Sequence, residues 1–139
     1  MEVVYYFDKD LNICPVKKYL ERFISSESEK SKESDRKNRI LATIDEKIQF
    51  IKENPNSRAA FLSPLHTHNF VEIKSRKDKN IVIRILYFFY DHKMILLNAF
   101  EKPDNYDTNK IKKEIEKHYI KTDSFIIKFK NTPTYEKYK

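Results

Sequence analysis

The stretch 80–89 constrains the fold more than any other part of this sequence. It reads Asn-Ile-Val-Ile-Arg-Ile-Leu-Tyr-Phe-Phe and is apolar except for its first residue and Arg84. A short, β-branched run of this kind is typical of a central strand that is covered on both faces. A guanidinium keeps its charge in such surroundings, so it must reach an anionic partner or the edge of a binding site. The sequence therefore predicts a central strand that carries one ion-paired or functional arginine.

Three extended segments are predicted in the middle of the chain, at 69–76, 80–89 and 94–100. Short polar turns join them, which favours an antiparallel meander. Because side chains alternate along a strand, one face of the central segment carries Arg84 and the opposite face carries Tyr87, which is expected in the core. The residues that share the face of Arg84 are Val82, Leu86 and Phe88.

Two amphipathic helices are predicted ahead of these segments. The first begins at Pro15, because the N–H that proline lacks would be unpaired at a helix start. Its apolar stripe consists of Val16, Tyr19, Leu20, Phe23 and Ile24. The second stripe consists of Ile40, Leu41, Ile44, Ile48 and Ile51, and it ends before Asn54-Pro55. The serine-rich, charged run 25–37 is either a linker or the polar start of the second helix.

The two ends of the chain add further elements. A first strand is predicted at 3–7, and a third helix at about 108–120. The apolar side of this helix consists of Ile111, Ile115 and Tyr119. Its charged positions, including His118, are assigned to a solvated face. The segment 125–129 has the composition of a last strand, and the final residues are expected to fray.

Composition excludes several classes of protein. The sequence contains no glycine, so it lacks the phosphate-binding loops and dinucleotide fingerprints that need close backbone approach. Turn positions with positive φ are expected to fall to Asn or Asp at 77–80 and 90–93. Cys14 is the only cysteine, which leaves no disulfide, and it is expected to be buried. No run approaches the roughly 20 apolar residues of a membrane span, and no signal sequence is evident, so a cytoplasmic location is expected.

Positive charge is concentrated in the second half of the chain. The net charge is +7; residues 1–60 carry 12 basic and 11 acidic side chains, whereas residues 61–139 carry 16 basic and 10 acidic ones. Such an excess is typical of proteins that bind a polyanion such as nucleic acid. A lysine-rich solvated surface explains the same charge equally well.

Four stretches, taken in order, resemble the RelE/HigB superfamily of type II toxin–antitoxin ribonucleases, in particular its HigB-like, phage-derived branch. Residues 14–20 resemble the start of that branch's first helix, and 70–74 resemble its Trp/Tyr-Glu-Leu-Arg strand. Residues 83–88 are similar to Tyr-Arg-hydrophobic-x-Tyr-Phe, and 96–102 are similar to Leu-Leu-x-x-Phe-x-Lys-Lys. The expected Lys-Lys-Glu-Ile-Glu follows at 112–116.

The resemblance implies an α+β, RelE-like fold in which two N-terminal helices pack on a small antiparallel sheet with a C-terminal helix. The toxin domain would span residues 1–121, and residues 122–139 would form a C-terminal extension. The implied activity is cleavage of messenger RNA on the ribosome, and the implied partner is a helix-turn-helix antitoxin. Cleavage in this superfamily uses the 2′-hydroxyl of the RNA and needs no metal or other cofactor. No membrane partner is implied.

The resemblance points to three candidate catalytic residues. Arg84 would hold the scissile phosphate, because a guanidinium has a permanent charge and donors that match phosphate oxygens. Lys74 and Lys102 would add positive charge, and either could act as a base if nearby cations lowered its pKa. For Arg84 the alternative is a salt bridge to Glu72 on the neighbouring strand. For each lysine the alternative is a solvated surface charge.

Four further residues are predicted to bind RNA, namely Arg76, His66, His68 and Tyr106. The two histidines precede the strand of Glu72 and could approach the same face, and Tyr106 could stack on a base. The histidine spacing would also suit a metal pair, but no third ligand is evident and no metal site is predicted. Loop histidines without a binding role are the alternative.

Two other functions are compatible with the sequence. Lys74 stands where the superfamily usually has arginine, and Pro103 replaces its second lysine. Lysine lacks the bidentate fork of arginine, so the first exchange alters a phosphate site. These departures suit an RNA-binding or ribosome-binding module without catalysis. A mobile-element protein whose basic face binds an acidic partner is the remaining alternative.

Overall fold

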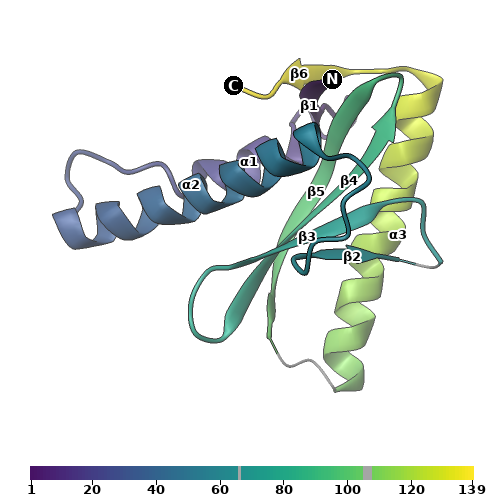
Figure 1. The fold of residues 1–139 in the computed structure, drawn as a ribbon. Coiled ribbons are helices and arrows are strands. Elements are labelled where there is room, and N and C mark those ends of the chain that lie inside the picture. Colours follow the sequence, from purple (N-terminus) through teal and green to yellow (C-terminus); the bar gives the residue numbers. More distant parts are fainter. Residues whose placement is uncertain (66, 105–107) are drawn as a thin grey trace.

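A computed structural model describes residues 1–65, 67–104 and 108–139 (Figure 1). The strands are β1 (Glu2–Tyr6), β2 (Leu62–Pro64), β3 (Val71–Arg76), β4 (Ile81–Tyr90), β5 (Lys93–Pro103) and β6 (Tyr135–Lys137). The helices are α1 (Pro15–Glu21), α2 (Ser31–Glu53) and α3 (Asn109–Asn131). No helix in these described ranges is both long enough and apolar enough to cross a membrane.

These six strands of the described ranges form one mixed sheet in the order β2-β3-β4-β5-β1-β6. The predicted meander is confirmed, because β3 and β4, and likewise β4 and β5, pair antiparallel. The first strand, however, pairs parallel with β5 and antiparallel with β6. Residues 3–6 are buried on both faces of the sheet, which is why β1 takes an inner position. The predicted fold class, with a small antiparallel sheet, is therefore wrong.

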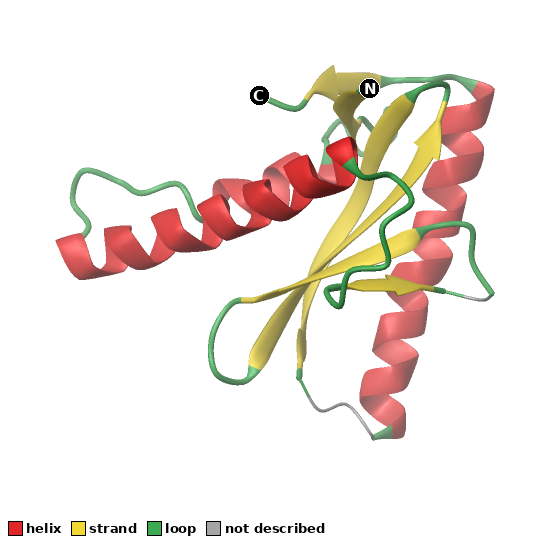
Figure 2. Cartoon of the chain, in the orientation of Figure 1, coloured by secondary structure: helices red, strands yellow, loops and turns green. Residues whose placement is uncertain are grey.

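Helices cover both faces of this sheet (Figure 2). Figure 1 shows α1 and α2 together on one face and α3 on the other. Odd-numbered residues of β4, such as Ile83 and Ile85, pack in the same cluster as Ile44 and Ile48 of α2. Leu86 and Phe88, at even-numbered positions of β4, pack in the cluster that contains α3. The alternation predicted for β4 is thus confirmed, and Tyr87 lies on the α1/α2 face.

Helix α3 continues for three turns beyond its predicted end. The predicted strand at 125–129 is wrong, because this segment lies inside α3. Phe125, Ile126 and Phe129 are buried and extend the apolar stripe that begins with Ile115 and Tyr119 at helical spacing. Aromatic and β-branched residues are enriched in strands, but in this segment packing against the sheet determines the helical conformation. The predicted boundary after residue 121 falls within this helix.

The hairpin between β4 and β5 turns without glycine. Asp91 and His92 both adopt positive φ, at 52° and 56°, as a two-residue hairpin loop requires. The prediction that Asp would serve such a position at 90–93 is confirmed at Asp91. The 77–80 turn, which the structure describes in full, contains no residue with positive φ. The 90–93 turn fixes where Tyr90 and Lys93 emerge from the sheet.

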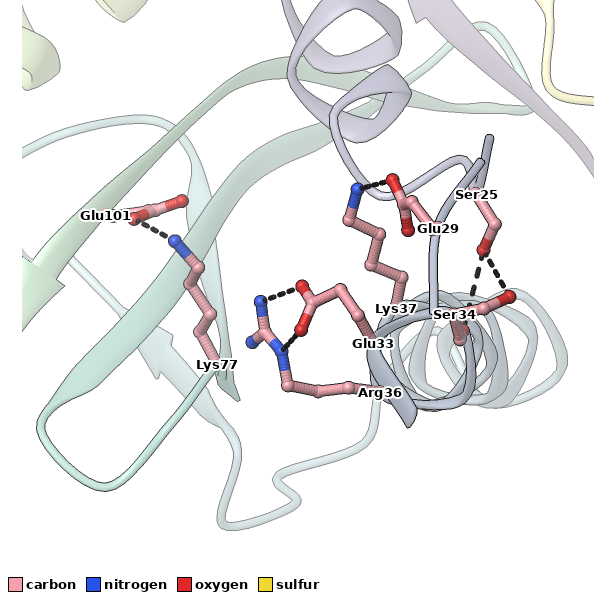
Figure 3. Close-up of polar contacts among 8 residues, drawn as sticks. All are labelled: Ser25, Glu29, Glu33, Ser34, Arg36, Lys37, Lys77 and Glu101. Carbon is pink, nitrogen blue, oxygen red and sulfur yellow. Dashed lines mark hydrogen bonds and ion pairs between the residues drawn. The ribbon is translucent and has the colours of Figure 1, made fainter. Parts of the chain in front are cut away.

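The charged run 25–37 joins α1 to α2 and forms the first turns of α2 (Figure 3). The hydroxyl of Ser34 donates to that of Ser25 at 2.9 Å, and Lys37 forms an ion pair with Glu29. Arg36 makes a bidentate contact with Glu33 one turn earlier. The alternative in which this run starts the second helix is therefore confirmed from residue 31 onward.

Candidate nucleic-acid interface

Three adjacent strands place basic side chains on the sheet face that α3 covers. Lys74 of β3 lies directly opposite Arg84 of β4. Lys102 of β5 lies opposite Val82, which is two residues from Arg84 on the same face. Arg76 follows Lys74 on β3 by two residues and shares its face. We call Lys74, Arg76, Arg84 and Lys102 the basic face.

Arg84 is buried and ion-paired. Its Nη1 donates to Oε2 of Glu72 at 2.7 Å, and only 2% of the residue is exposed. The hydroxyl of Tyr119 on α3 donates to the other oxygen of Glu72 at 2.9 Å. The cross-strand salt bridge that the sequence left open is therefore present. A phosphate does not reach Arg84 while α3 occupies this position, and its role as a phosphate anchor stays a prediction.

Two further residues of the basic face have carboxylate partners nearer to solvent. Lys102 donates to Glu114 of α3 at 3.1 Å, and this hydrogen bond lowers the pKa of the Glu114 carboxyl. Arg76 donates to Asp104 at 2.9 Å, and both side chains of this pair are more than half exposed. Exposed pairs of this kind are weak and screened by salt, so a phosphate can compete for the cation of Arg76.

Lys74 differs from its neighbours on the basic face. Its side chain is partly exposed and forms no ion pair with any residue in the described part of the chain. Its position opposite Arg84 places it beside a second cation whose charge Glu72 offsets. Lys74 is therefore the member of the basic face best able to receive an anionic group from solvent.

His118 of α3 is a candidate that the sequence interpretation missed, since it was assigned to a solvated face. Its ring is half-buried and stacks on Phe100 of β5, with centroids 4.1 Å apart and planes within 2°. Burial lowers the pKa of His118, and the positive charges of Lys102 and Lys121 lower it further. A neutral imidazole beside cations can accept a proton at neutral pH.

His68 links the segment before β3 to α3 through contacts with acidic and aromatic side chains. Its Nδ1 lies 2.7 Å from Asp123, its Nε2 lies 3.5 Å from Glu116, and its side chain is 9% exposed. The ring also packs on Phe70 and Tyr119. These contacts leave His68 little surface for an RNA base. His66 and Tyr106, the other two predicted RNA-binding residues besides Arg76, lie outside the described residues.

A second carboxylate, Glu101, organises the opposite face near the end of β5. It accepts from Tyr19 at 2.6 Å and pairs with Arg22 and Lys77, the last contact being visible in Figure 3. Burial would raise the pKa of Glu101, but these donors outweigh burial and lower it. This cluster links α1 to the β3–β4 hairpin, and we assign it a structural role.

No group of three or more metal-ligating side chains occurs among the residues that the structure describes. Comparison of the chain with protein-family models, with curated proteins and with solved structures finds no match in any of the three.

Proposed function

We propose that this protein is a cytoplasmic ribonuclease toxin related to the RelE/HigB superfamily, which cleaves messenger RNA on the ribosome and is neutralised by a helix-turn-helix antitoxin. The observation that carries the proposal is the basic face with His118 beside it. Lys74, Arg84 and Lys102 come from three adjacent strands, and His118 has a lowered pKa. Fixed cations next to a neutral base are what cleavage by an internal 2′-hydroxyl needs.

In the proposed reaction the 2′-hydroxyl attacks the adjacent phosphorus and the bond to the 5′-oxygen breaks. His118 accepts the proton of the 2′-hydroxyl, which its neutral state at pH 7 allows. Lys74 binds the non-bridging phosphate oxygens, and Lys102 adds charge from β5. A water or a protonated side chain supplies the proton that the leaving oxygen takes up. The products are a 2′,3′-cyclic phosphate and a free 5′-hydroxyl.

In the proposed reaction Arg84 contributes positive charge next to Lys74 without contacting the phosphate. Its ion pair with Glu72 keeps the guanidinium fixed in the sheet. Direct contact with a phosphate would require the N-terminal half of α3 to move away. This half is held by the Lys102–Glu114 pair and by the burial of Ile115 and Tyr119, so phosphate contact is assigned to Lys74 and not to Arg84.

The second candidate is an RNA-binding or ribosome-binding module without catalysis. One observation favours it: two of the three predicted catalytic cations already have carboxylate partners, at 2.7 Å for Arg84 and 3.1 Å for Lys102. A binding module would use the exposed lysines and leave these pairs intact. The two candidates differ in whether cleaved RNA accumulates.

Induced expression in a bacterial host, followed by mapping of 5′-hydroxyl RNA ends, tests the proposal. The wild-type chain is expected to arrest growth and to produce new ends within coding regions. His118→Ala should slow cleavage about 10²- to 10⁴-fold, the usual loss for a general base. Lys74→Ala should also relieve the arrest.

Matched controls are His92→Asn, which keeps a residue tolerant of positive φ, and Lys32→Ala on the exposed start of α2. Both should remain toxic. A harmless wild-type chain that is folded, or a His118→Ala chain as toxic as wild type, would contradict the nuclease. Ribosome or RNA association without new 5′ ends would select the binding module.

A further inference from the structure

Exposed aromatic rings and lysines gather at the C-terminal end of α3, away from the basic face. Tyr90 ends β4 and Tyr135 begins β6, and they are 38% and 41% exposed. Lys93 begins β5, Phe129 and Lys130 lie in the last turn of α3, and we call these five residues the aromatic–lysine patch. Large aromatic side chains left this open to solvent commonly mark a binding surface.

Contacts with buried aromatic residues hold the tyrosine rings of the patch in place. Phe129 is buried and contacts both tyrosines, with centroids 6.0 Å from Tyr90 and 6.2 Å from Tyr135. Tyr90 also stacks on Phe88 at 5.9 Å with planes 24° apart. Because these contacts fix the ring of Tyr90, a flat ligand would meet it without a large loss of side-chain entropy.

A lysine lies over each exposed ring. Nζ of Lys130 is 5.5 Å from the centroid of Tyr90, and Nζ of Lys93 is 5.6 Å from that of Tyr135. Lys130 forms no ion pair with the residues described in the structure. The side chain of Lys93 is 21% exposed and pairs with Asp91 at 3.7 Å, and Asp91 is itself 77% exposed. Lys130 is therefore open to phosphate oxygens, and at Lys93 a phosphate can replace the exposed carboxylate of Asp91.

We infer that the aromatic–lysine patch binds single-stranded RNA, with bases stacked on the tyrosine rings and phosphates held by the two lysines. Alternating aromatic rings and cations are the arrangement by which proteins hold unpaired strands, because every base offers a π-face and every linkage a charge. A duplex keeps its bases stacked inside the helix and cannot use these rings. This inference rests on the RNA-directed function proposed above and assigns it a second contact region.

The position of the patch suits a strand that also reaches the basic face. Tyr90 and Arg84 lie on the same face of β4, six residues apart, which corresponds to roughly 20 Å at the rise of a strand. Lys117 and Lys121 are exposed on α3 between the two regions. A strand of a few nucleotides that follows α3 would thus meet positive charge along its length.

Fluorescence anisotropy with a labelled single strand of about 12 nucleotides tests the inference. The probe carries 2′-O-methyl groups, so it cannot be cleaved through the 2′-hydroxyl. Tyr90→Ala should weaken binding about 5- to 100-fold, because one stacked base is lost, whereas Tyr90→Phe keeps the ring and should stay within about 2-fold of wild type. Lys130→Gln should reduce the slope of log K against log salt by about 0.7.

The control is Phe50→Ala, which removes a ring that is 41% exposed on α2 and should leave affinity unchanged. Melting temperatures show whether each variant is folded. Three results would overturn the inference. The first is a folded Tyr90→Ala variant that binds the strand with wild-type affinity, and the second is a wild-type protein that does not bind the strand. The third is a Tyr90→Ala variant that loses as much affinity for a duplex of the same sequence as for the single strand.

The outcome for the patch is separable from that for the nuclease. If His118→Ala abolishes cleavage but binds the probe normally, the two regions act independently, as inferred. If wild type cleaves no RNA but binds the strand in a Tyr90-dependent manner, the nuclease fails and the patch stands. If cleavage occurs while Tyr90→Ala binds like wild type, the patch fails and the nuclease stands.

Discussion

The two faces of the sheet are built differently. The buried cluster between the sheet and α1/α2 consists of apolar residues and tyrosines. The face under α3 carries most of the buried polar side chains found among the described residues. Those on the α3 face are Glu72, Arg84, Asn98, Lys102 and Thr122. The α1/α2 face therefore stabilises the fold mainly through apolar burial, with its charged cluster around Glu101 at the end of β5, whereas the α3 face must satisfy charges and hydrogen bonds in its interior.

The difference continues along α3 itself. Its C-terminal half packs through Phe125, Ile126 and Phe129. Its N-terminal half buries Ile115 and Tyr119 in the same cluster and adds two hydrogen bonds, from Lys102 to Glu114 and from Tyr119 to Glu72. Apolar burial holds both halves on the sheet, and the half over the basic face depends on polar contacts as well.

The largest effect is expected from breaking the buried ion pair. Arg84→Met leaves the Glu72 carboxylate buried without its cation, which should lower the free energy of unfolding by about 4 kcal/mol. Urea denaturation measures this loss. The double variant with Glu72→Gln removes the stranded charge but keeps an acceptor for Tyr119, so it should recover more than half of the loss. Equal stability of single and double variants would show that the pair is not the cause.

A somewhat smaller effect is expected from a cavity on the apolar face. Ile48 is fully buried between α2 and the sheet, and Ile48→Ala should cost about 3 kcal/mol through lost burial and the cavity left behind. The same denaturation experiment gives the value. Because no charge is stranded, no second substitution at a polar site should restore stability. Recovery by such a substitution would contradict the contrast between the faces.

Local patterns predicted much of this architecture. The alternation around Arg84 identified β4, and the apolar stripe at 40–51 identified α2. The meander was predicted from the polar turns at 77–80 and 90–93. The parallel partner of β1 was missed, because strand pairing between distant segments leaves no local signal. The strand predicted at 125–129 shows that β-branched and aromatic residues follow the surface against which they pack.

The candidate site was predicted in part. The predicted meander put Lys74 and Arg84 on neighbouring strands and Lys102 just beyond the end of the third, and the register in the structure brings them together. His118 was missed although it lies three residues after Ile115 and four before Thr122, which is the spacing of the buried stripe. That spacing was the available signal. The cover that α3 forms over Arg84 depends on tertiary packing and could not be inferred from local pattern.

A smaller loss of stability is expected from removing the hydroxyl of Tyr119, on the α3 face of the sheet. Tyr119→Phe removes the hydrogen bond to Glu72 and keeps the ring, so it should cost about 2 kcal/mol, the usual range for a bond to a charged group. Tyr87→Phe is the matched control, since Tyr87 is also buried and lies on the α1/α2 face. Its cost should be smaller. A larger loss for Tyr87→Phe would remove the distinction between the faces.

The smallest effect concerns pH and is specific to the polar face. The pKa of His118 in the folded protein lies below its usual value of 6.5, because of burial and the charges of Lys102 and Lys121. Below pH 6.5 the unfolded chain therefore binds more protons at this residue, so stability falls as pH decreases through that window.

His118→Asn should flatten this part of the stability curve between about pH 7.5 and 5.5, as measured by urea denaturation at each pH. His92→Asn, in the exposed β4–β5 turn, is the control for removing a histidine elsewhere in the chain. If both variants change the slope equally, the environment of His118 is not special. If only His118→Asn does, a proton-linked group sits at the edge of the basic face, where the proposed cleavage needs one that is neutral at pH 7.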